Sequence, residues 1–305
     1  MHRMTRVVFM GSPEFAVPVL RALASQFPVS AVITRPDRPS GRGRELRPPP
    51  VKVAAGELGL EILQPTRLAA AGVLPRLQEL SPDLIVVAAF GQILKPEILA
   101  LPVHGCLNVH ASLLPRWRGA APIQAAILNG DAETGITITL MDQGLDTGGI
   151  LSQDRIPIGA DDTGGTLTGK LAPLGADLLL RTLPAYLGGD LQAVPQDASR
   201  ATHAPMLKKQ DGLLDLSMPA RLLERRVRAL NPWPGGYFSW AGAILKIHRA
   251  HVEPGMAAVG ERLVIGQLPA LGTGSDLLVL DELQPAGKRI MAGRLFLLGA
   301  RGWSG

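Results

Sequence analysis

The chain has 305 residues, a formal net charge of +5 and a single cysteine, and its length predicts two domains of about 150 residues each, with one large α/β domain as the alternative. Apolar residues make up 46%, which excludes a disordered chain. One cysteine excludes an internal disulfide framework and a cysteine-cluster metal site. No apolar run reaches the roughly 18 residues that a membrane span needs, and the start lacks a cleavage signature. We therefore expect a soluble protein of the reducing cytoplasm.

The first fifty residues predict two strands around a helix, followed by a long loop. Residues 5–10 form a β-branched apolar run, residues 14–25 have apolar positions at helical spacing, and residues 29–33 predict a second strand. Ser12 stands where it could cap the helix. Residues 34–50 contain five prolines and two glycines, so we expect no regular structure there. Long loops in compact domains are usually functional or disordered.

Strand and helix patterns continue to alternate toward the middle of the chain. The predicted elements are a helix at 51–58 and strands at 60–63, 83–89, 105–112, 135–142 and 150–158. This alternation predicts a doubly wound α/β domain with a mostly parallel sheet. Only one glycine, Gly11, lies in the turn after the first strand, where a dinucleotide site needs a G-x-G-x-x-G pattern. The sequence therefore disfavours an NAD site.

The pattern changes around residue 200. Helix signals at 178–187 are followed by a polar stretch with proline and glycine, which is a candidate linker. Ser217 then precedes a predicted helix that ends at Leu230, with apolar residues on one face and a basic stripe of Arg221, Arg225 and Arg228 on another. Beyond this helix, short strand-like runs between glycine and proline turns fit a small all-β barrel or sandwich.

The net charge is unevenly distributed. Residues 1–207 hold 18 basic and 18 acidic side chains, whereas residues 208–305 hold 13 and 8, so the second part carries the whole excess. A separate group of five arginines lies in residues 34–50 against Asp37 and Glu45. This distribution suits a polyanion such as nucleic acid. On charge alone, a solvated basic surface is an equal alternative.

Chemistry-bearing side chains occur in two segments of the first part. Asn108 and His110 lie two residues apart at the end of a predicted strand, so both point to the same face, at the edge where α/β proteins place ligand sites. Asp146 follows another strand in a glycine-rich loop. An amide, an imidazole and a carboxylate fit proton transfer and oxyanion stabilisation, and direct transfer between two bound substrates is favoured because no nucleophile is evident beside them. An ordinary strand-end turn with capping side chains is the open alternative.

Other reactive residues give weaker signals. Cys106 lies in an apolar strand, which predicts a core residue. The six histidines are scattered, so their spacing predicts no metal site. The sequence has neither the G-x-S-x-G pattern of many serine hydrolases nor the H-E-x-x-H pattern of zinc proteases.

Around this constellation the sequence resembles a known family. The segments NVHASLLPRWRGAAPIQ (108–124) and MDQGLDTG (141–148) are similar to formyltransferases that use 10-formyltetrahydrofolate. Four further segments occur in the order found in the methionyl-tRNA formyltransferase family: GSPEFAVPVL (11–20), TRPDRPSGRGRELRPPPVKVAA (34–55), NPWPGG (231–236) and LQPAGKRIM (283–291). The resemblance covers nearly the whole chain, and the ordered combination is specific.

The resemblance implies a fold, a reaction and a set of residues. It implies a Rossmann-like catalytic domain over residues 1–190, a linker over 191–210 and an OB-like tRNA-binding barrel over 211–305. The reaction is transfer of the formyl group of 10-formyltetrahydrofolate, a cosubstrate, to the amino group of methionyl initiator tRNA, without a metal. The implied catalytic residues are Asn108, His110 and Asp146. The implied folate-binding residues are Ser112, Leu113, Leu114 and Pro115, with loops at 90–94 and 140–145 beside them.

The resemblance also implies contacts with tRNA. In the family, the loop that corresponds to residues 34–50, the arginine loop, enters the acceptor end of the tRNA. Arg42 matches the key arginine of that loop. Arg38 and Arg44 lie beside it, and Lys208 and Lys209 are the expected phosphate contacts near the linker. We expect the protein to act as a monomer.

Three alternatives share parts of this pattern. Another folate-dependent formyltransferase would act on a small amine or a sugar-nucleotide amine with the same three residues, but it would need neither the basic C-terminal part nor the arginine loop. A formyl-folate hydrolase would use water as the acceptor. A non-catalytic RNA-binding protein would not require Asn108, His110 and Asp146.

Overall fold

The structure is a computed structural model that describes residues 5–40 and 45–304. The chain divides into two compact units. The first unit consists of the segments Met1–Pro122, Glu133–Ile156 and Thr168–Ala204. The second unit consists of the segments Ile123–Ala132, Pro157–Leu167 and Pro205–Gly305. No helix among the described residues combines the length and the apolar composition that crossing a membrane requires.

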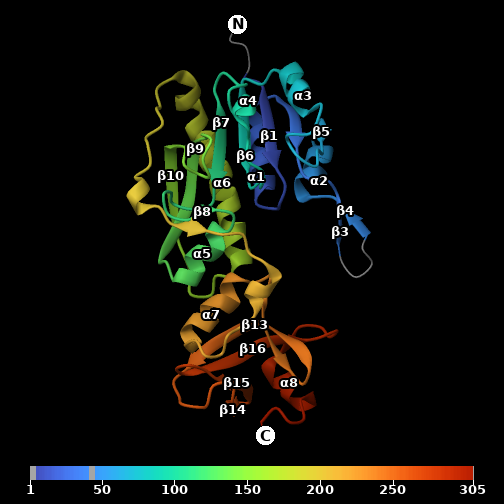
Figure 1. Ribbon diagram of the computed structural model, residues 1–305, viewed down its shortest axis with the longest axis vertical. Helices are drawn as coiled ribbons and strands as arrows, with labels where there is room; N and C mark the ends of the chain where they lie inside the picture. Colours follow the sequence, from blue (N-terminus) through green and yellow to red (C-terminus); the bar gives the residue numbers. More distant parts are fainter. Residues whose placement is uncertain (1–4, 41–44, 305) are drawn as a thin grey trace. The chain divides into compact units, whose positions relative to one another are not determined.

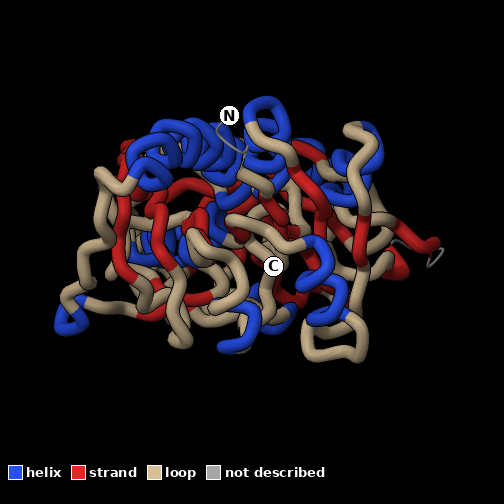
Figure 2. Tube along the Cα trace, turned by 90° about the horizontal axis from the view of Figure 1, so that it is seen from above, coloured by secondary structure: helices blue, strands red, loops and turns tan. Residues whose placement is uncertain are grey.

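A seven-stranded sheet runs through the first unit (Figures 1 and 2). In spatial order its strands are β10 (Gly149–Pro157), β9 (Glu133–Leu140), β7 (Cys106–His110), β6 (Leu84–Ala88), β1 (Val7–Gly11), β2 (Val29–Ile33) and β5 (Ile62–Leu63). Neighbouring strands in the series β5, β2, β1, β6 and β7 pair in parallel, and β9 pairs antiparallel with β7. The chain starts in the middle of the sheet and builds outward in both directions, which confirms the predicted doubly wound, mostly parallel fold.

Helices connect these strands along the chain (Figure 1). They are α1 (Ala16–Gln26), α2 (Pro50–Glu57), α3 (Val73–Leu80), α4 (Pro96–Leu99), α5 (Pro122–Asn129) and α6 (Gly164–Gly188). A short parallel pair of strands joins β8 (Arg118–Gly119) to β11 (His203–Ala204). A 3-10 turn, η1 (Ala198–Arg200), precedes β11.

Different helices cover the two faces of the sheet. Cys106 of β7 belongs to an apolar cluster that includes Leu77 of α3 and Ile98 of α4. On the opposite face, α6 approaches β7 so closely that a Cβ atom at Gly175 would lie 2.9 Å from Val109 Cγ1. Because side chains alternate along a strand, Asn108 and His110 point to the face of Cys106, away from α6.

The predicted cap of the first helix is wrong. Helix α1 begins at Ala16 with Phe15 as its N-cap residue, three positions beyond Ser12. Ser12 Oγ instead accepts hydrogen bonds from Arg35 N (3.1 Å) and Thr34 Oγ1 (3.2 Å). Because β1 and β2 end side by side, the hydroxyl finds partners at the end of the neighbouring strand rather than at its own helix.

The proline-rich segment contains regular structure, contrary to the prediction. Strands β3 (Arg38–Ser40) and β4 (Glu45–Arg47) pair antiparallel as a hairpin, with Arg38 opposite Arg47 and Pro39 opposite Leu46. A proline can lie in a strand where its missing N–H is not needed for pairing, as on the outer side of a two-stranded ribbon. Arg42 and Arg44 lie outside the described residues.

The second unit contains an antiparallel sheet. In spatial order its strands are β12 (Gly236–Trp240), β13 (Ala243–Glu253), β16 (Leu277–Pro285), β15 (Leu268–Gly272) and β14 (Arg262–Ile265), and β17 (Met291–Ala292) pairs with β16. The strands predicted for this part are confirmed, but the expected all-β composition is not, because helix α8 (Gly293–Gly299) follows β17. Within the described chain, however, β12 and β14 form open edges, so the sheet does not close into a barrel.

Helices fill the core of this second sheet. They are α7 (Ala220–Ala229) and α8 (Gly293–Gly299), and a 3-10 turn, η2 (Lys209–Gly212), precedes α7. Leu223 and Val227 of α7 and Phe296 of α8 share one apolar cluster with the strands. These helices bury the apolar face of the sheet, which therefore does not need to close on itself.

The helix predicted after Ser217 begins later than expected. Helix α7 starts at Ala220, and Ser217 Oγ donates a hydrogen bond to Asp215 Oδ1 (2.7 Å) instead of capping the helix. Its apolar face is buried as predicted. Within the predicted basic stripe, Arg228 donates to the carboxylate of Glu224 and to the Asp162 carbonyl oxygen (3.0 Å). That arginine therefore stabilises the second unit from within.

Candidate active site

The three predicted catalytic side chains lie together in the first unit. Asn108 and His110 end strand β7, and β9 runs antiparallel beside it, so that Leu140 at the end of β9 pairs with Leu107. The loop after β9 then turns back toward the end of β7 and brings Asp146 to Asn108. Asn108 Nδ2 donates a hydrogen bond to Asp146 Oδ1 (3.2 Å), and His110 Nδ1 lies 3.6 Å from the same oxygen.

The hydrogen bonds of His110 determine which ring nitrogen carries its proton. His110 Nε2 lies 2.9 Å from the carbonyl oxygen of Trp117, which can only accept a hydrogen bond. Nε2 is therefore the protonated nitrogen of the neutral ring, and Nδ1 faces Asp146. The sequence could not identify Trp117 as this partner, because its backbone adopts a left-handed φ of 62° that brings its carbonyl oxygen to His110.

Asp146 is held in an unusual backbone conformation. Its φ is +53°, a left-handed value that aspartate tolerates better than most residues. Asp146 Oδ2 accepts a hydrogen bond from Gly119 N (2.8 Å) while Oδ1 accepts from Asn108. Both carboxylate oxygens are engaged in a site where only 14% of the Asp146 side chain and 6% of the His110 side chain are exposed. In such a shielded site, hydrogen bonds and charges act strongly.

The segment predicted to bind folate is attached to the sheet by residues that the sequence did not single out. Thr137 Oγ1 donates to the Ser112 carbonyl oxygen (2.6 Å) and accepts from Leu114 N (3.0 Å). Gln153 Nε2 donates to the Leu114 carbonyl oxygen and to Thr137 Oγ1, each at 2.9 Å. Ser112 is fully buried, and its hydroxyl donates to the Arg116 carbonyl oxygen (2.6 Å). The residue pattern of segments 135–142 and 150–158 predicts strands, but it does not indicate that Thr137 and Gln153 bind this segment.

The side chains around this segment differ in exposure. Leu114 is buried, whereas Leu113 and Pro115 are half-buried. In the two neighbouring loops, Ile93 is 74% exposed and Leu145 is 56% exposed.

The residues predicted to contact tRNA fall in different places. Arg38 is exposed on the β3–β4 hairpin and lies directly opposite Arg47, an exposed arginine of the same segment to which the sequence assigns no role. Like charges directly opposite each other in a strand pair are unfavourable, so an anion between them would stabilise the hairpin. Lys208 and Lys209 are exposed and belong to the second unit.

Cys106 lies on the same strand and the same face as Asn108, yet its environment makes it inert. Only 1% of Cys106 is exposed, and burial raises the pKa of its thiol to about 12. The prediction of a core residue is confirmed. Among the described residues, no three or more His, Cys, Asp or Glu side chains are grouped so that they could hold a metal ion.

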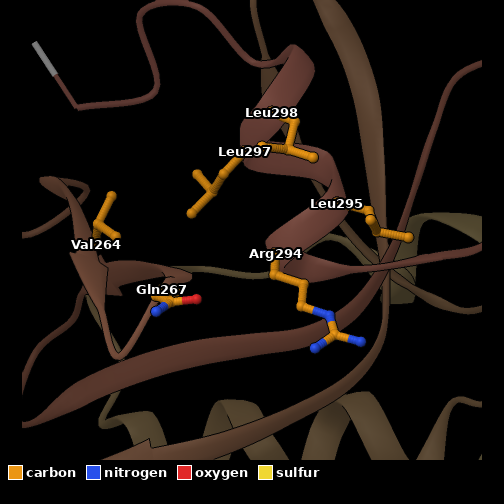
Figure 3. Close-up of a pocket in the computed structure, with 6 residues that line it drawn as sticks. All are labelled: Val264, Gln267, Arg294, Leu295, Leu297 and Leu298. Atoms are coloured by element: carbon orange, nitrogen blue, oxygen red, sulfur yellow. The ribbon is translucent and has the colours of Figure 1, made fainter.

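A separate cavity lies in the second unit, with a volume of about 450 Å³ (Figure 3). Its lining residues are Val264, Gln267, Arg294, Leu295, Leu297 and Leu298. Figure 3 shows Arg294 and the leucines on α8, with Val264 and Gln267 on the opposite wall. These six residues include no carboxylate and no imidazole, so the cavity has none of the acid–base groups that the cluster around His110 contains.

Comparison with known proteins identifies the family of the whole chain. Residues 5–183 match the formyl transferase family, and residues 206–301 match the C-terminal domain of formyl transferases. A methionyl-tRNA formyltransferase of Myxococcus xanthus is 49% identical over 297 residues, which cover 96% of this chain and 95% of the relative. This chain belongs to the methionyl-tRNA formyltransferase family. The family predicted from the ordered segments is thereby confirmed.

Further relatives agree in sequence and in fold. A methionyl-tRNA formyltransferase of Chloroflexus aggregans is 46% identical over 299 residues, or 96% of this chain and 97% of the relative. An N-formyltransferase of Helicobacter canadensis, solved with folinic acid and dTDP-3-aminofucose, superposes with a TM-score of 0.67 at 16% identity. The superposition covers 93% of this chain and all of that protein, so the two proteins share a fold at low sequence identity.

Proposed function

We propose that this protein transfers the formyl group of 10-formyltetrahydrofolate to the amino group of methionyl initiator tRNA, giving N-formylmethionyl-tRNA for translation initiation. One observation carries the assignment of the chemistry: Asn108 and His110 converge on the Asp146 carboxylate at the end of β7. The family membership supports the nature of the two substrates.

The neutral amine of the methionyl group attacks the formyl carbon, and a C–N bond forms while negative charge develops on the formyl oxygen. Asn108 uses one amide hydrogen to bind Asp146, and its second amide hydrogen donates to that oxygen. One donor of this kind is typically worth roughly 3–4 kcal/mol of barrier. The bond to Asp146 fixes the direction of the amide before the substrates bind.

His110 moves the proton that the amine must lose. Because Nε2 donates to the Trp117 carbonyl oxygen, Nδ1 is the nitrogen that accepts the proton, and Asp146 stabilises the resulting imidazolium. When the tetrahedral intermediate collapses, the bond between the formyl carbon and the folate nitrogen breaks. That nitrogen takes the electron pair and the proton from His110, so the products are the formylated amine and tetrahydrofolate.

The remaining residues bind the two substrates. Ser112, Leu113, Leu114 and Pro115 form the folate-binding segment, which Thr137 and Gln153 attach to the sheet. Arg38, Arg42, Arg44, Lys208 and Lys209 contact the tRNA. Residues 1–190 form the catalytic part, residues 191–210 the linker and residues 211–305 the tRNA-binding part. The protein acts as a monomer in the cytoplasm.

The test is to mix the full chain with 10-formyltetrahydrofolate and methionyl initiator tRNA, and to measure formylmethionine, free tetrahydrofolate and formate. Equal amounts of formylmethionyl-tRNA and tetrahydrofolate are expected. Formate without formylated tRNA would identify a hydrolase. Turnover with a sugar-nucleotide amine but not with tRNA would identify a different acceptor, and tRNA binding without any turnover would identify an RNA-binding protein.

A further inference from the structure

The part of the predicted linker that precedes the second unit lies against the candidate active site. This strap segment (residues 196–204) belongs to the first unit. It contacts two catalytic segments that are distant in the sequence: the loop that contains Asp146, and the chain between Pro115 and Ala121. Neither contact follows from the sequence, where this stretch has the polar composition of a simple connector.

Gln196 makes the contact with the Asp146 loop. Its Nε2 donates to the carbonyl oxygens of Asp146 (2.9 Å) and Gly148 (2.7 Å). A single amide group thus joins both ends of the turn in which Asp146 has its left-handed φ of +53°. This conformation still costs a non-glycine residue some free energy, so hydrogen bonds from its surroundings help to hold it there. Gln196 supplies that restraint.

The other end of the Gln196 amide holds a buried charge. Gln196 Oε1 accepts from Arg118 Nε (3.1 Å) and from the same guanidinium at Nη2 (2.8 Å), and only 7% of Arg118 is exposed. Arg118 lies between Trp117, which binds His110, and Gly119, which binds Asp146. Gln196 therefore connects the segment that orients His110 with the loop that contains Asp146.

The C-terminal half of the strap segment fixes the same segment through backbone pairing. Thr202 Oγ1 accepts from Trp117 N (2.9 Å), and the Thr202 carbonyl oxygen accepts from Arg118 N (2.9 Å). The Ala204 carbonyl oxygen accepts from Ala120 N (2.8 Å) and lies so close that a Cβ atom at Gly119 would be 2.5 Å from it. These bonds fix the positions of the Trp117 carbonyl oxygen, which binds His110, and of the Gly119 amide, which binds Asp146.

We infer that the strap segment is part of the catalytic machinery, with Gln196 as a positioning residue that acts through Asp146. This inference rests on the proposed function. Gln196 touches neither reacting group; it holds Asp146 and Arg118 so that the Asn108–Asp146–His110 geometry exists before the substrates bind. Displacement of a catalytic group by about 1 Å can cost 10²-fold in rate, so loss of this restraint lowers the rate of formyl transfer more than it lowers substrate affinity.

The test compares Gln196→Met, which keeps the side-chain length but removes both halves of the amide, with Gln192→Met on the same linker, where the side chain is exposed. For Gln196→Met we expect the single-turnover rate to fall about 10- to 100-fold, with the KM of each substrate within about threefold of wild type. Gln192→Met should keep both within about twofold. A normal rate for Gln196→Met, or a loss confined to KM, would overturn the inference.

A double-mutant cycle separates positioning from general damage. In an Asp146→Asn background, Gln196→Met should change the residual rate by less than about twofold, because the group that it positions is already lost. Fully additive losses would overturn the role assigned to Gln196. Gln196→Glu keeps an acceptor for Arg118 but no donor for the two carbonyl oxygens. Its single-turnover rate should therefore fall as much as that of Gln196→Met, while its melting temperature should be higher than that of Gln196→Met. Full activity of Gln196→Glu would also overturn the inference.

Amide hydrogen exchange gives a readout that does not depend on activity. Residues 141–148 should exchange faster in Gln196→Met than in wild type or Gln192→Met, because the Asp146 turn is released. Unchanged exchange there overturns the strap inference even if the enzyme is active. If wild type produces no formylmethionyl-tRNA, the proposed function fails, and the exchange result still decides whether Gln196 holds the loop.

Discussion

The catalytic cluster and the arginine hairpin both belong to the first unit, but their electrostatics are arranged in opposite ways. Asn108, His110 and Asp146 lie within a closed set of hydrogen bonds in which each carboxylate oxygen has a donor. Arg38 and Arg47 face each other across an exposed hairpin, with like charges opposed. From this contrast we expect the chemistry to depend on groups positioned in advance, and recognition to depend on the opposed positive charges of the hairpin, which a polyanion would balance.

Removal of a catalytic amide tests the first half of this comparison and should have the largest effect. We expect Asn108→Ala to lower the single-turnover rate about 10²- to 10³-fold, because the donor to the developing oxyanion is lost. His110→Ala should lower it by about two orders of magnitude, because the proton acceptor is lost. Asn129→Ala, an exposed asparagine at the end of α5, serves as the control. A rate close to wild type in either catalytic variant would refute the assignment.

Removal of the opposed arginines tests the second half. Arg38→Ala combined with Arg47→Ala should raise the KM for tRNA about tenfold and reduce the slope of log affinity against log salt by about 2, because two phosphate contacts are lost. The KM for folate should not change. Arg76→Ala combined with Arg155→Ala removes the same number of positive charges at positions away from the hairpin, where each arginine is paired with a glutamate, and is the control for net charge. Equal effects of the two double variants would show that only net charge matters.

The base of the hairpin gives a smaller effect with a defined pH dependence. Hydrogen bonds from Gln64 and from Lys52 hold the pKa of the Asp37 carboxyl below its usual range. We expect Lys52→Met to raise the KM for tRNA about two- to fivefold. An effect of this size corresponds to the free energy of one partly exposed ion pair. An acid with a lowered pKa stabilises the fold above its ordinary pKa and loses that contribution as the pH falls through the lowered value.

The difference in melting temperature between wild type and Lys52→Met should therefore be largest near pH 6 and become smaller below about pH 4. Thermal unfolding monitored by circular dichroism at pH 6, 4 and 3 measures it. A difference that stays constant over this range would mean that the carboxylate of Asp37 is not the partner that matters.

The smallest effect on catalysis is expected at Cys106, which shares the strand and the face of Asn108. Cys106→Ala should leave kcat within about twofold of wild type and lower the free energy of unfolding by about 1 kcal/mol, because packing and the weak hydrogen bond from Sγ to the Ile98 carbonyl oxygen (3.8 Å) are lost. Because its pKa is raised to about 12, the thiol should resist iodoacetamide at pH 8 in the folded protein and react after unfolding. Rapid alkylation of the native protein would contradict this account of strand β7.

The sequence predicts the elements of the site better than the contacts between them. Two-residue spacing was enough to place Asn108 and His110 on one face of β7, because side-chain alternation is a local property. The partners of these residues depend on distant segments: the Trp117 carbonyl oxygen reaches His110 through a left-handed turn, and Gly119 N reaches Asp146 across 27 positions. Hydrophobic patterns carry no information about such bonds.

The errors have the same origin. Ser12 was placed as a helix cap from its neighbours in the chain, but its hydroxyl binds the end of β2, which becomes adjacent only when the sheet forms. The sequence does not predict the hairpin at Arg38, because composition alone favours a loop in a segment rich in proline. The open antiparallel sheet of the second unit follows from α7 and α8 covering its apolar face, and short strand-like runs do not distinguish an open sheet from a barrel.

The pairing of β11 with β8 has a consequence for the exchange of parts between relatives. A fragment that ends where α6 ends, at Gly188, would retain every strand of the seven-stranded sheet but would lose the residues that pair with Arg118 and Gly119. A chimera with a foreign C-terminal unit should therefore be joined after Ala204. Joined there, the recipient keeps its own chain around Asn108, His110 and Asp146, including the residues that pair with Arg118 and Gly119.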